Sequence, residues 1–258
     1  YMGQHTNWRL LVLLILLAGS MITLLFIGPI PQDVSYHHFA DQRNYFNIPN
    51  FFNVITNGPF LIIGFYATVW LSKTNKVCFY SQSEILPYLI YFVSVAFIAI
   101  GSGYYHWNPN NSTLVFDRLP MTIAFMSFLS LIIAERINLK LGLNSLVPLI
   151  FFGIASVVYW YLTAIHGHGD LRPYALVQFY PMLAIPWILI VYPAQYTEQR
   201  FLWFSLLYYI LAKLCEWQDR FIYQILEHVV SGHALKHLMA AMATYCIFLY
   251  LKKRRQIR

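Results

Sequence analysis

Charged residues are scarce in this chain. Only 10% of its 258 residues are Asp, Glu, Lys or Arg, whereas a soluble domain carries roughly 25%. Five of the 17 Lys and Arg crowd into residues 252–258, next to an apolar run. Such a cluster is typical of a cytoplasmic segment beside a membrane and argues against a nucleic-acid partner. The low charge predicts an integral membrane protein.

Cysteine is scarce as well. The sequence has only Cys78, Cys215 and Cys246, and no Cys-x-x-Cys pair. This argues against a disulfide framework and against a zinc site built from thiolates. Internal repeats and low-complexity tracts are also lacking, which favours one integral membrane domain.

Long apolar runs, in contrast, are abundant. A membrane-spanning helix needs about 20 mostly apolar residues, and continuous runs of that length predict helices because barrel strands alternate. The first run is longer than a signal-peptide core and no Ala-x-Ala-like site follows, so we expect a retained helix. The expected spans are 8–30, 50–71, 86–106, 114–134, 145–165, 174–192, 201–222 and 233–251.

These spans predict an all-α integral membrane protein with a seven-helix transmembrane core and one additional N-terminal transmembrane helix. The N-terminal helix takes residues 1–31, the core takes 32–251, and 252–258 form a basic cytoplasmic tail. Lys and Arg concentrate on the cytoplasmic side of membrane proteins. With both termini cytoplasmic, eleven of them lie on the inner side and three on the outer side: Arg43, Arg118 and Arg172. Lys213, Arg220 and Lys236 fall within spans and do not count.

Five polar residues are expected at the outer ends of these spans. Ser102 and His106 end one span, Asp117 begins the next, and His233 and His237 begin the last. Residues four apart share a helix face, about 5–6 Å apart at Cβ. Three histidines with an open fourth position form a known catalytic zinc arrangement. We therefore predict that His106, His233 and His237 bind zinc, with Asp117 and Ser102 beside it.

Each of these residues also has a structural interpretation. Interfacial histidines can be satisfied by the backbone or by water. Asp117 could favour a helix start through the macrodipole, made plausible by Pro120. Ser102 lies in the small-residue run 101–103, which favours close helix approach. The functional alternatives are a general base for Asp117 and oxyanion stabilisation for Ser102. The remaining loop histidines are expected to be solvated: His37, His38, His166 and His168.

Further polar residues lie inside the apolar runs. Lys213 and Glu216 are three residues apart and Glu216 and Arg220 four apart, so that they can pair along one helix. Together with Asp219 they could instead support the zinc ligands. Asn53 and Asn57 share a helix face and could bond across helices or approach a substrate headgroup.

The set Ser102-x-x-x-His106, Asp117 and His233-x-x-x-His237 resembles the pattern of the alkaline ceramidase family. This family belongs to a superfamily of seven-span membrane hydrolases that includes adiponectin-receptor-like proteins. The resemblance covers roughly residues 41–250. It includes the stretches Asn50-Phe-Phe-Asn53-Val-Ile-Thr-Asn57 and Ser231-Gly-His233-Ala-Leu-Lys236-His237.

The resemblance implies that the three histidines bind zinc, that Asp117 is the base and that Ser102 assists. Eukaryotic ceramidases of this pattern also carry an Asp-Trp-x-Glu-x-Asn stretch that binds calcium. The corresponding residues here are Asp41, Asn44 and Asn50, which are the candidate calcium ligands. The Trp and Glu are missing and Arg43 adds a positive charge, which disfavours a cation that prefers anionic oxygen ligands.

The sequence and the resemblance together predict a zinc-dependent membrane amidohydrolase. Its substrate would be a ceramide-like membrane lipid, cleaved at the N-acyl bond into a long-chain base and a fatty acid. The site would face the outer (periplasmic or lumenal) side. Two alternatives remain: a hydrolase of another N-acyl lipid or of a phospholipid, and a non-catalytic receptor like the adiponectin-receptor-like proteins. The short termini and loops leave little room for a partner-binding domain, which disfavours the receptor.

The bias of Lys and Arg generates a prediction about topology. A reporter fused after Arg258 should read cytoplasmic, and one inserted at Asn110 should read outside, because positive charge is retained on the inner side. Protease or cysteine-labelling accessibility of the two reporters measures this. The reverse result for both reporters would place the histidines on the inner side.

Overall fold

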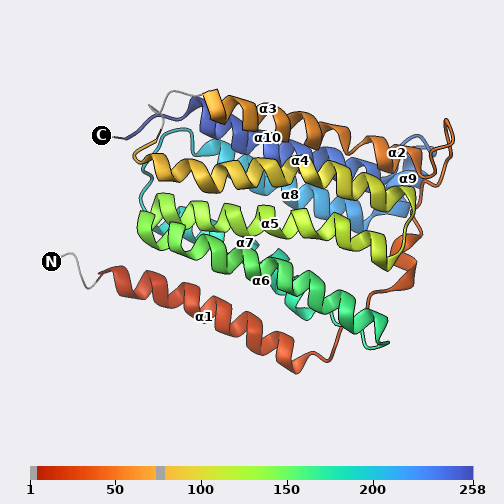
Figure 1. Cartoon of the computed structure of the whole chain (residues 1–258), viewed down its shortest axis with the longest axis horizontal. Helices are drawn as coiled ribbons and strands as arrows, with labels where there is room; N and C mark the ends of the chain where they lie inside the picture. The colour runs from red at the N-terminus through yellow and green to blue at the C-terminus, as the bar shows by residue number, and fades with distance from the viewer. Residues whose placement is uncertain (1–4, 74–78, 258) are drawn as a thin grey trace.

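The computed structural model describes residues 5–73 and 79–257, and in these ranges the chain is helical. Cys78 and Lys76, which entered the cysteine and charge arguments, lie outside the described residues. The long helices run along a common direction (Figure 1). They are α1 (His5–Phe26), α3 (Gly58–Lys73), α4 (Ile85–Trp107), α5 (Asn111–Arg136), α6 (Leu139–Ile165), α7 (Arg172–Val191), α8 (Arg200–Trp217) and α10 (Gly232–Lys253). Shorter helices are α2 (Phe51–Ile55), α9 (Asp219–Ile225), η1 (Val34–His37) and η3 (Gln82–Glu84).

Seven stretches of the described residues are long and apolar enough to cross a membrane, which confirms an all-α membrane protein. They include all the expected spans except 201–222. That stretch is not one helix, because α8 ends at Trp217 and α9 begins at Asp219. α8 packs along α10, and its eighteen residues include Arg200, Lys213 and Glu216. The eighth crossing therefore stays a prediction.

The N-terminal helix α1 lies outside the main bundle and contacts it through α7 (Figure 1). Its carbonyl oxygens accept hydrogen bonds from α7 side chains, at 3.3 Å from Trp187 Nε1 to Arg9 and at 3.2 Å from the Tyr180 hydroxyl to Leu13. Most of its large apolar side chains are exposed, including Leu14 at 62%. Such a surface suits lipid contact, since a lone helix in water would hide this face. The arrangement fits the predicted helix added to a seven-helix core.

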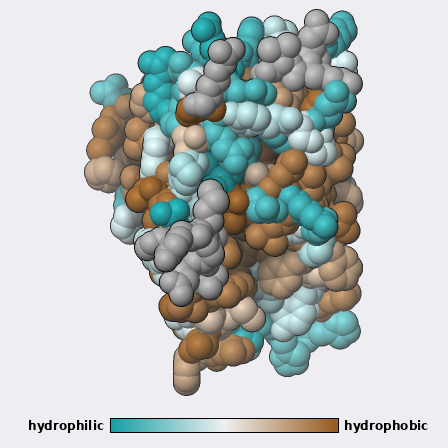
Figure 2. All heavy atoms as spheres, turned by 90° about the vertical axis from the view of Figure 1, so that its left-hand side faces the viewer, coloured by the Kyte–Doolittle hydropathy of each residue, from teal (hydrophilic) through white to brown (hydrophobic). Residues whose placement is uncertain are grey.

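The helix directions bring the start of α1 and the end of α10 to the same side of the bundle. α1 begins and α10 ends at one end of the bundle, whereas α2 and α9 lie at the other end (Figure 1). Figure 2 looks onto the end where α1 begins; hydrophilic residues gather over its upper part, and the lower part is more hydrophobic, with a further hydrophilic group at the lower right. For convenience we call this the terminal end and its opposite the α2 end. The placement of both termini on the cytoplasmic side stays a prediction.

A buried polar network lies at the terminal end and involves the expected basic tail. Arg254 has a fully buried side chain that pairs with Glu135 and lies 3.6 Å from Glu84. Its Nη1 also donates to the Tyr88 hydroxyl at 2.8 Å. The Tyr250 hydroxyl donates to Glu135 at 3.0 Å. Arg254 is therefore a structural charge inside the bundle, not one of the surface charges that the sequence suggested.

The rest of the tail is also ordered. The amide of Thr197 donates to the Arg255 carbonyl at 2.9 Å, and the amide of Ile257 donates to the Gln195 carbonyl at 2.9 Å. These bonds tie the tail to the connection between α7 and α8. Residues 252–257 thus close the terminal end and do not form a separate segment.

The small-residue run 101–103 sets the spacing of α4 and α5. A Cβ at Gly101 would lie 2.0 Å from the Phe116 carbonyl oxygen, so only glycine allows this approach. A Cβ at Gly103 would meet nothing within 4 Å. The close contact lies immediately before Ser102 and beside Asp117, which brings these two side chains toward each other. The predicted packing role therefore belongs to Gly101.

Substituting these two glycines separates the packing contact from helix propensity. Gly101→Ala should destabilise the fold by about 1–3 kcal/mol, because α4 and α5 must move apart, as in other overpacked cores. Gly103→Ala is the matched control and should be neutral or stabilising by about 0.5–1 kcal/mol, since alanine favours a helix interior. Unfolding of both variants by a denaturing detergent measures the difference. Equal stability of the two variants would remove the proposed contact.

Candidate metal centre at the α2 end

Three histidines from two helices meet at the α2 end of the bundle. His106 lies in the last turn of α4, and His233 and His237 lie in the first turns of α10. The Nε2 atom of His106 is 3.2 Å from that of His237 and 3.3 Å from that of His233. All three side chains are buried, and one nitrogen from each lies within 4.8 Å of the others. The structure therefore brings together the histidines that the sequence predicted, in a group that could hold a metal ion.

The spacing of these nitrogens suits a tetrahedral ion. Ligands about 2.0–2.1 Å from a tetrahedral zinc lie roughly 3.3–3.4 Å from one another. The two separations from His106 Nε2, 3.2 and 3.3 Å, fall close to this value, and all three ligand nitrogens lie within 4.8 Å of one another. Three imidazole nitrogens directed at each other have few protons to share, so a shared cation is a natural partner for their lone pairs.

Thr56, the residue that follows α2, sets the tautomer of His237. The Thr56 hydroxyl donates to the Phe52 carbonyl oxygen at 2.6 Å, which uses its only proton. Its oxygen lies 2.9 Å from His237 Nδ1 and must therefore accept a proton from that nitrogen. The Nε2 atom of a neutral His237 then carries a free lone pair, which is the form that binds metals.

Hydrogen bonds to the main chain fix the two helix ends that carry the histidines. The Asn50 amide donates to the His106 carbonyl oxygen at 2.9 Å. Asp219 accepts from the His233 amide at 2.7 Å and from the Ala40 amide at 3.0 Å. The Ser231 hydroxyl caps the start of α10. Asp219, which was expected to support the site, thus does so through the backbone.

An aromatic ring covers the histidine group. The ring centroid of Phe39 lies 4.7 Å from that of His106 and 4.8 Å from that of His233. Phe39 is 4% exposed and belongs to the connection between η1 and α2. It shields the imidazoles from the α2 end, which strengthens electrostatic interactions within the group.

The two remaining predicted residues lie beside the histidines. Ser102 and Asp117 are both buried, and the Ser102 hydroxyl is hydrogen-bonded to the Asp117 carboxylate. Both side chains line a cavity that His237 also lines. Asp117 therefore does not act only as a helix-start residue, since α5 begins six residues earlier with Asn110 as its N-cap.

A lysine that the sequence analysis set aside lies in direct contact with the histidine group. Lys236 Nζ is 3.3 Å from His233 Nε2 and 2.9 Å from Glu216 Oε1. Glu216 also pairs with Lys213 and accepts from the Tyr36 hydroxyl at 3.2 Å. The Tyr36 phenol lies in η1, and burial and the Glu216 carboxylate raise its pKa well above the ordinary value. The expected pairing of Lys213 with Glu216 is confirmed, and Lys236 joins it.

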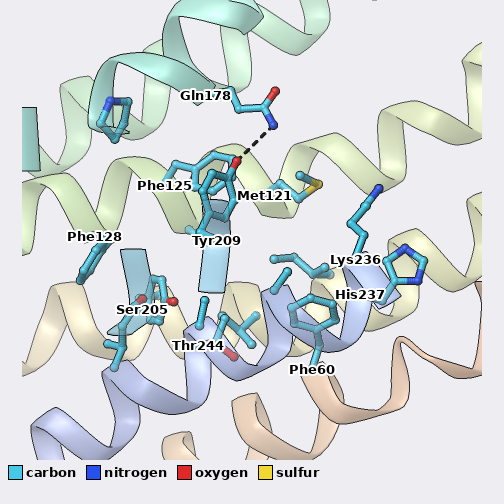
Figure 3. A pocket seen from close by; sticks show the side chains of 18 of the residues that line it. Phe60, Met121, Phe125, Phe128, Gln178, Ser205, Tyr209, Lys236, His237 and Thr244 are labelled. Carbon is cyan, nitrogen blue, oxygen red and sulfur yellow. Dashed lines mark hydrogen bonds between the residues drawn. The ribbon is translucent and has the colours of Figure 1, made fainter. Parts of the chain in front are cut away.

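An elongated apolar cavity extends from this site into the bundle (Figure 3). It encloses about 930 Å³ of empty space, its open mouth included. His237 and Lys236 lie toward one end and Phe128 at the other. At its middle the Gln178 amide donates to the Tyr209 hydroxyl at 3.1 Å. A second cavity shares the wall residues Asp117, Met121, Gln178, Tyr209, Lys236 and Ala240 with it.

Asn53 and Asn57 occupy different surroundings. The Asn53 amide donates to the Asp41 carbonyl oxygen at 3.3 Å, away from the cavity. Asn57 lines the cavity with His237, and its Oδ1 is buried without a hydrogen-bond partner in the described residues. Asn57 is therefore the one of the two that can face a bound molecule.

The candidate calcium residues have other partners. Both carboxylate oxygens of Asp41 accept from the Arg43 guanidinium, at 2.9 and 2.6 Å. The Asn50 side chain donates to a carbonyl oxygen, and Asn44 is exposed. Arg43 also donates to the Val229 carbonyl oxygen at 2.8 Å. An arginine thus neutralises Asp41 where the resemblance implies a calcium ion.

One loop histidine differs from its expected solvated state. His37 is half-buried, with Nδ1 2.9 Å from the Tyr105 hydroxyl and Nε2 3.0 Å from Asn111 Oδ1. Burial lowers the pKa of His37 below its ordinary value. The remaining ones are exposed as expected: His38, His166 and His168.

Sequence reasoning missed Thr56, Phe39 and Lys236. Only Lys236 carried a signal, because an ionisable residue inside an apolar span is a functional candidate by default. Comparisons with known proteins found no matching family model and no matching curated protein.

The histidine group generates a prediction about metal content. The purified protein should hold about one metal ion per chain, as expected for a three-histidine site with an open position. His237→Ala should lose most of it. Thr56→Val, which removes the bond to Nδ1, should weaken binding by about 10–100-fold, as is usual when such a supporting bond is lost. Elemental analysis of dialysed protein measures all three.

The matched control is His166→Ala, because His166 is exposed and lies far along the chain from the group. It should keep the full metal content. Full retention of metal by His237→Ala would rule out the assigned ligand set, whereas loss in both histidine variants would indicate a general effect on folding.

Proposed function

We propose that the protein is a zinc-dependent membrane amidohydrolase that cleaves the N-acyl bond of ceramide-like lipids. The products would be a long-chain base and a fatty acid. The observation that carries the proposal is the meeting of three imidazoles, with His106 Nε2 3.2 and 3.3 Å from the Nε2 atoms of the other two, beside an apolar cavity that His237, Asp117 and Ser102 line. The resemblance to the alkaline ceramidase family supports it.

The donor set favours zinc over other ions. Imidazole suits zinc, copper, iron and nickel, whereas magnesium and calcium prefer oxygen ligands. Zinc bound by three histidines polarises a carbonyl group and lowers the pKa of a bound water to about 7. His106, His233 and His237 would hold it, and Thr56 keeps the lone pair of His237 free for this purpose.

Asp117 is suited to move the proton. It is the carboxylate that lines the cavity with His237, and its hydrogen bond from Ser102 orients it. As general base it would accept a proton from the attacking water and return it to the amide nitrogen as the carbon–nitrogen bond breaks. That return matters because an amine leaves as a neutral group. While Asp117 holds the proton, the Ser102 hydroxyl would be free to donate to the oxyanion on the acyl carbon.

The apolar cavity suits one long hydrocarbon chain. From His237 to Ile247, both of which line it, α10 rises about 15 Å at roughly 1.5 Å per residue. An extended chain advances roughly 1.3 Å per carbon for C–C bonds of about 1.52 Å, so about a dozen carbons fit this length. The side-chain Oδ1 of Asn57, which lacks a partner in the described residues, is placed to accept from a substrate N–H or hydroxyl.

The route into this cavity favours entry from the bilayer. α8 packs chiefly on α10, and α7 packs on α5, α6 and α1, so α7 and α8 hardly contact each other. Residues of both helices line the two joined cavities. A lipid could slide between them without leaving the apolar phase, which avoids the cost of exposing its chains to water. The same route would serve another N-acyl lipid or a phospholipid ester.

Asp117→Asn tests the proposal. Asparagine keeps the size of the side chain but cannot accept the proton at neutral pH. The variant should keep its metal and lose at least about a hundredfold in ceramide hydrolysis, since general base catalysis contributes about 10²–10⁴-fold. The long-chain base released in a detergent assay and the metal content are measured on the same sample.

Asp33→Asn is the control, because Asp33 is an exposed carboxylate of the α1–α2 connection. It should keep wild-type activity. Near wild-type turnover by Asp117→Asn with its metal intact would remove Asp117 from the mechanism. Absence of hydrolysis by the zinc-loaded wild type on ceramide, other N-acyl lipids and phospholipid esters would favour the receptor alternative.

A further inference from the structure

Arg118 is a buried cation without an acidic partner. Its side chain is 5% exposed, and no carboxylate of the described residues lies within ion-pair distance of it. Nη2 donates to Gln32 Oε1 at 2.6 Å. Nη1 is buried and has no hydrogen-bond partner in the described part of the chain. A guanidinium in such a state normally has an anion nearby, because burying an unpaired charge costs several kcal/mol.

Aromatic rings hold the Arg118 guanidinium in place. Its Cζ atom lies 4.1 Å from the ring centroid of Trp160 and 4.5 Å from that of Tyr174. The Trp160 Nε1 atom is also buried without a partner among the described residues. Because the rings lie beside the guanidinium, its edge remains free to bind a ligand. The cation–π contacts offset only part of the free-energy cost of removing the charge from water.

Arg118 lines the second cavity, which joins the metal centre. This cavity is bounded by α5, α7 and α8 and by the connection after α1, and it encloses about 1090 Å³ of empty space with its mouth included. Its wall includes Lys213, Lys236 and Glu216, with Asp117 at the junction to the apolar cavity. A molecule whose chain fills the apolar cavity would therefore have its headgroup beside Arg118.

The charges of the second cavity do not balance. Its described wall holds the cations Arg118, Lys213 and Lys236 and the anions Asp117 and Glu216. Glu216 is shared by the two lysines, at 2.9 Å from Lys236. Asp117 is bonded to Ser102 and leaves Arg118 unpaired. One positive charge therefore remains without a partner in an apolar surrounding, where ionisable residues ordinarily pair.

We propose that this cavity is an anion-binding subsite in which Arg118 binds the phosphate of a lipid headgroup. The inference rests on the proposed hydrolase function and specifies its substrate class as an N-acyl lipid that carries a phosphate. A guanidinium with a free edge matches phosphate geometry better than an ammonium does. Lys213 lies on the same wall and adds positive charge, while the aromatic rings fix the orientation of the headgroup.

Two alkyl probes test the subsite, one with a phosphate group and one with a hydroxyl group. Dodecyl phosphate and dodecanol are added to the zinc-loaded full chain in a neutral maltoside detergent, and the bound probe is measured by equilibrium dialysis. Neither probe has an N-acyl bond, so binding is read without hydrolysis. The wild type should prefer dodecyl phosphate by about 10–100-fold, which corresponds to a hydrogen-bonded charge pair. Equal binding of the two probes would overturn the subsite.

Three variants identify the residue that is responsible for the preference for dodecyl phosphate. Arg118→Met should remove it, and Arg118→Lys, which keeps the charge but not the forked geometry, should reduce it. Arg220→Met is the matched control, because Arg220 is exposed and should keep the wild-type preference. An unchanged preference in both Arg118 variants would assign the anion to another cation. Metal content of each variant, measured alongside, checks that it is folded.

Inorganic phosphate distinguishes the source of the anion. If it competes with dodecyl phosphate at equal concentration, the subsite binds free phosphate and the headgroup assignment is wrong. We expect competition only at concentrations at least about tenfold higher, because the alkyl chain adds apolar burial in the joined cavity. A protein that hydrolyses no lipid can still bind the probes as expected. Failure of the subsite and failure of the hydrolase proposal are therefore distinct results.

Discussion

The candidate site depends on hydrogen bonds to the main chain. These bonds hold together two helix ends that are distant in sequence. His106 and His233 are separated by most of the core, and neither imidazole can hold the other in place. Asn50 fixes the carbonyl of His106, and Asp219 fixes the amide of His233 together with the loop at Ala40. Buried polar groups in an apolar bundle must find partners. These bonds therefore satisfy the helix ends and set the distance between the imidazoles at once.

The two ends of the bundle use polar groups in opposite ways. At the terminal end the buried charges are matched, because Arg254 pairs with Glu135 and lies near Glu84. At the α2 end the match is incomplete: Glu216 pairs with two lysines, but Arg118 lacks an acidic partner among the described residues, and three imidazoles face each other. A balanced network stabilises a single packing, whereas unbalanced groups need a ligand. This imbalance marks the α2 end, and not the terminal end, as the candidate functional end.

The sequence predicted what depends on local spacing and on span position. The i,i+4 pair of His233 and His237 shares a helix face, and charge counting placed His106 at the same end, so the group could be derived. Partners such as Thr56 for His237 could not, because Thr56 is 181 residues away and its hydroxyl has no special pattern. The break at Gln218 was missed because apolar residues resume after the short polar stretch 218–220, so that 201–222 still resembles one span. Arg254 was assigned to the basic cytoplasmic tail, because four other Lys and Arg lie in residues 252–258.

In the proposed function, the shared wall of the two cavities would determine which bond of a lipid can react. Asp117 and Lys236 line both cavities, and the histidine group lies beside them. A molecule with its acyl chain among the apolar residues and its headgroup beside Arg118 must cross this wall at the junction of chain and head. In an N-acyl lipid that junction is the amide. The bond that reacts would then be the one at which the substrate changes from apolar to polar. Apolar burial would position the acyl chain and charge pairing would position the headgroup, each independently of the other. In the proposed function, recognition of the amide itself would need only Asn57 Oδ1 and the groups around the candidate metal centre.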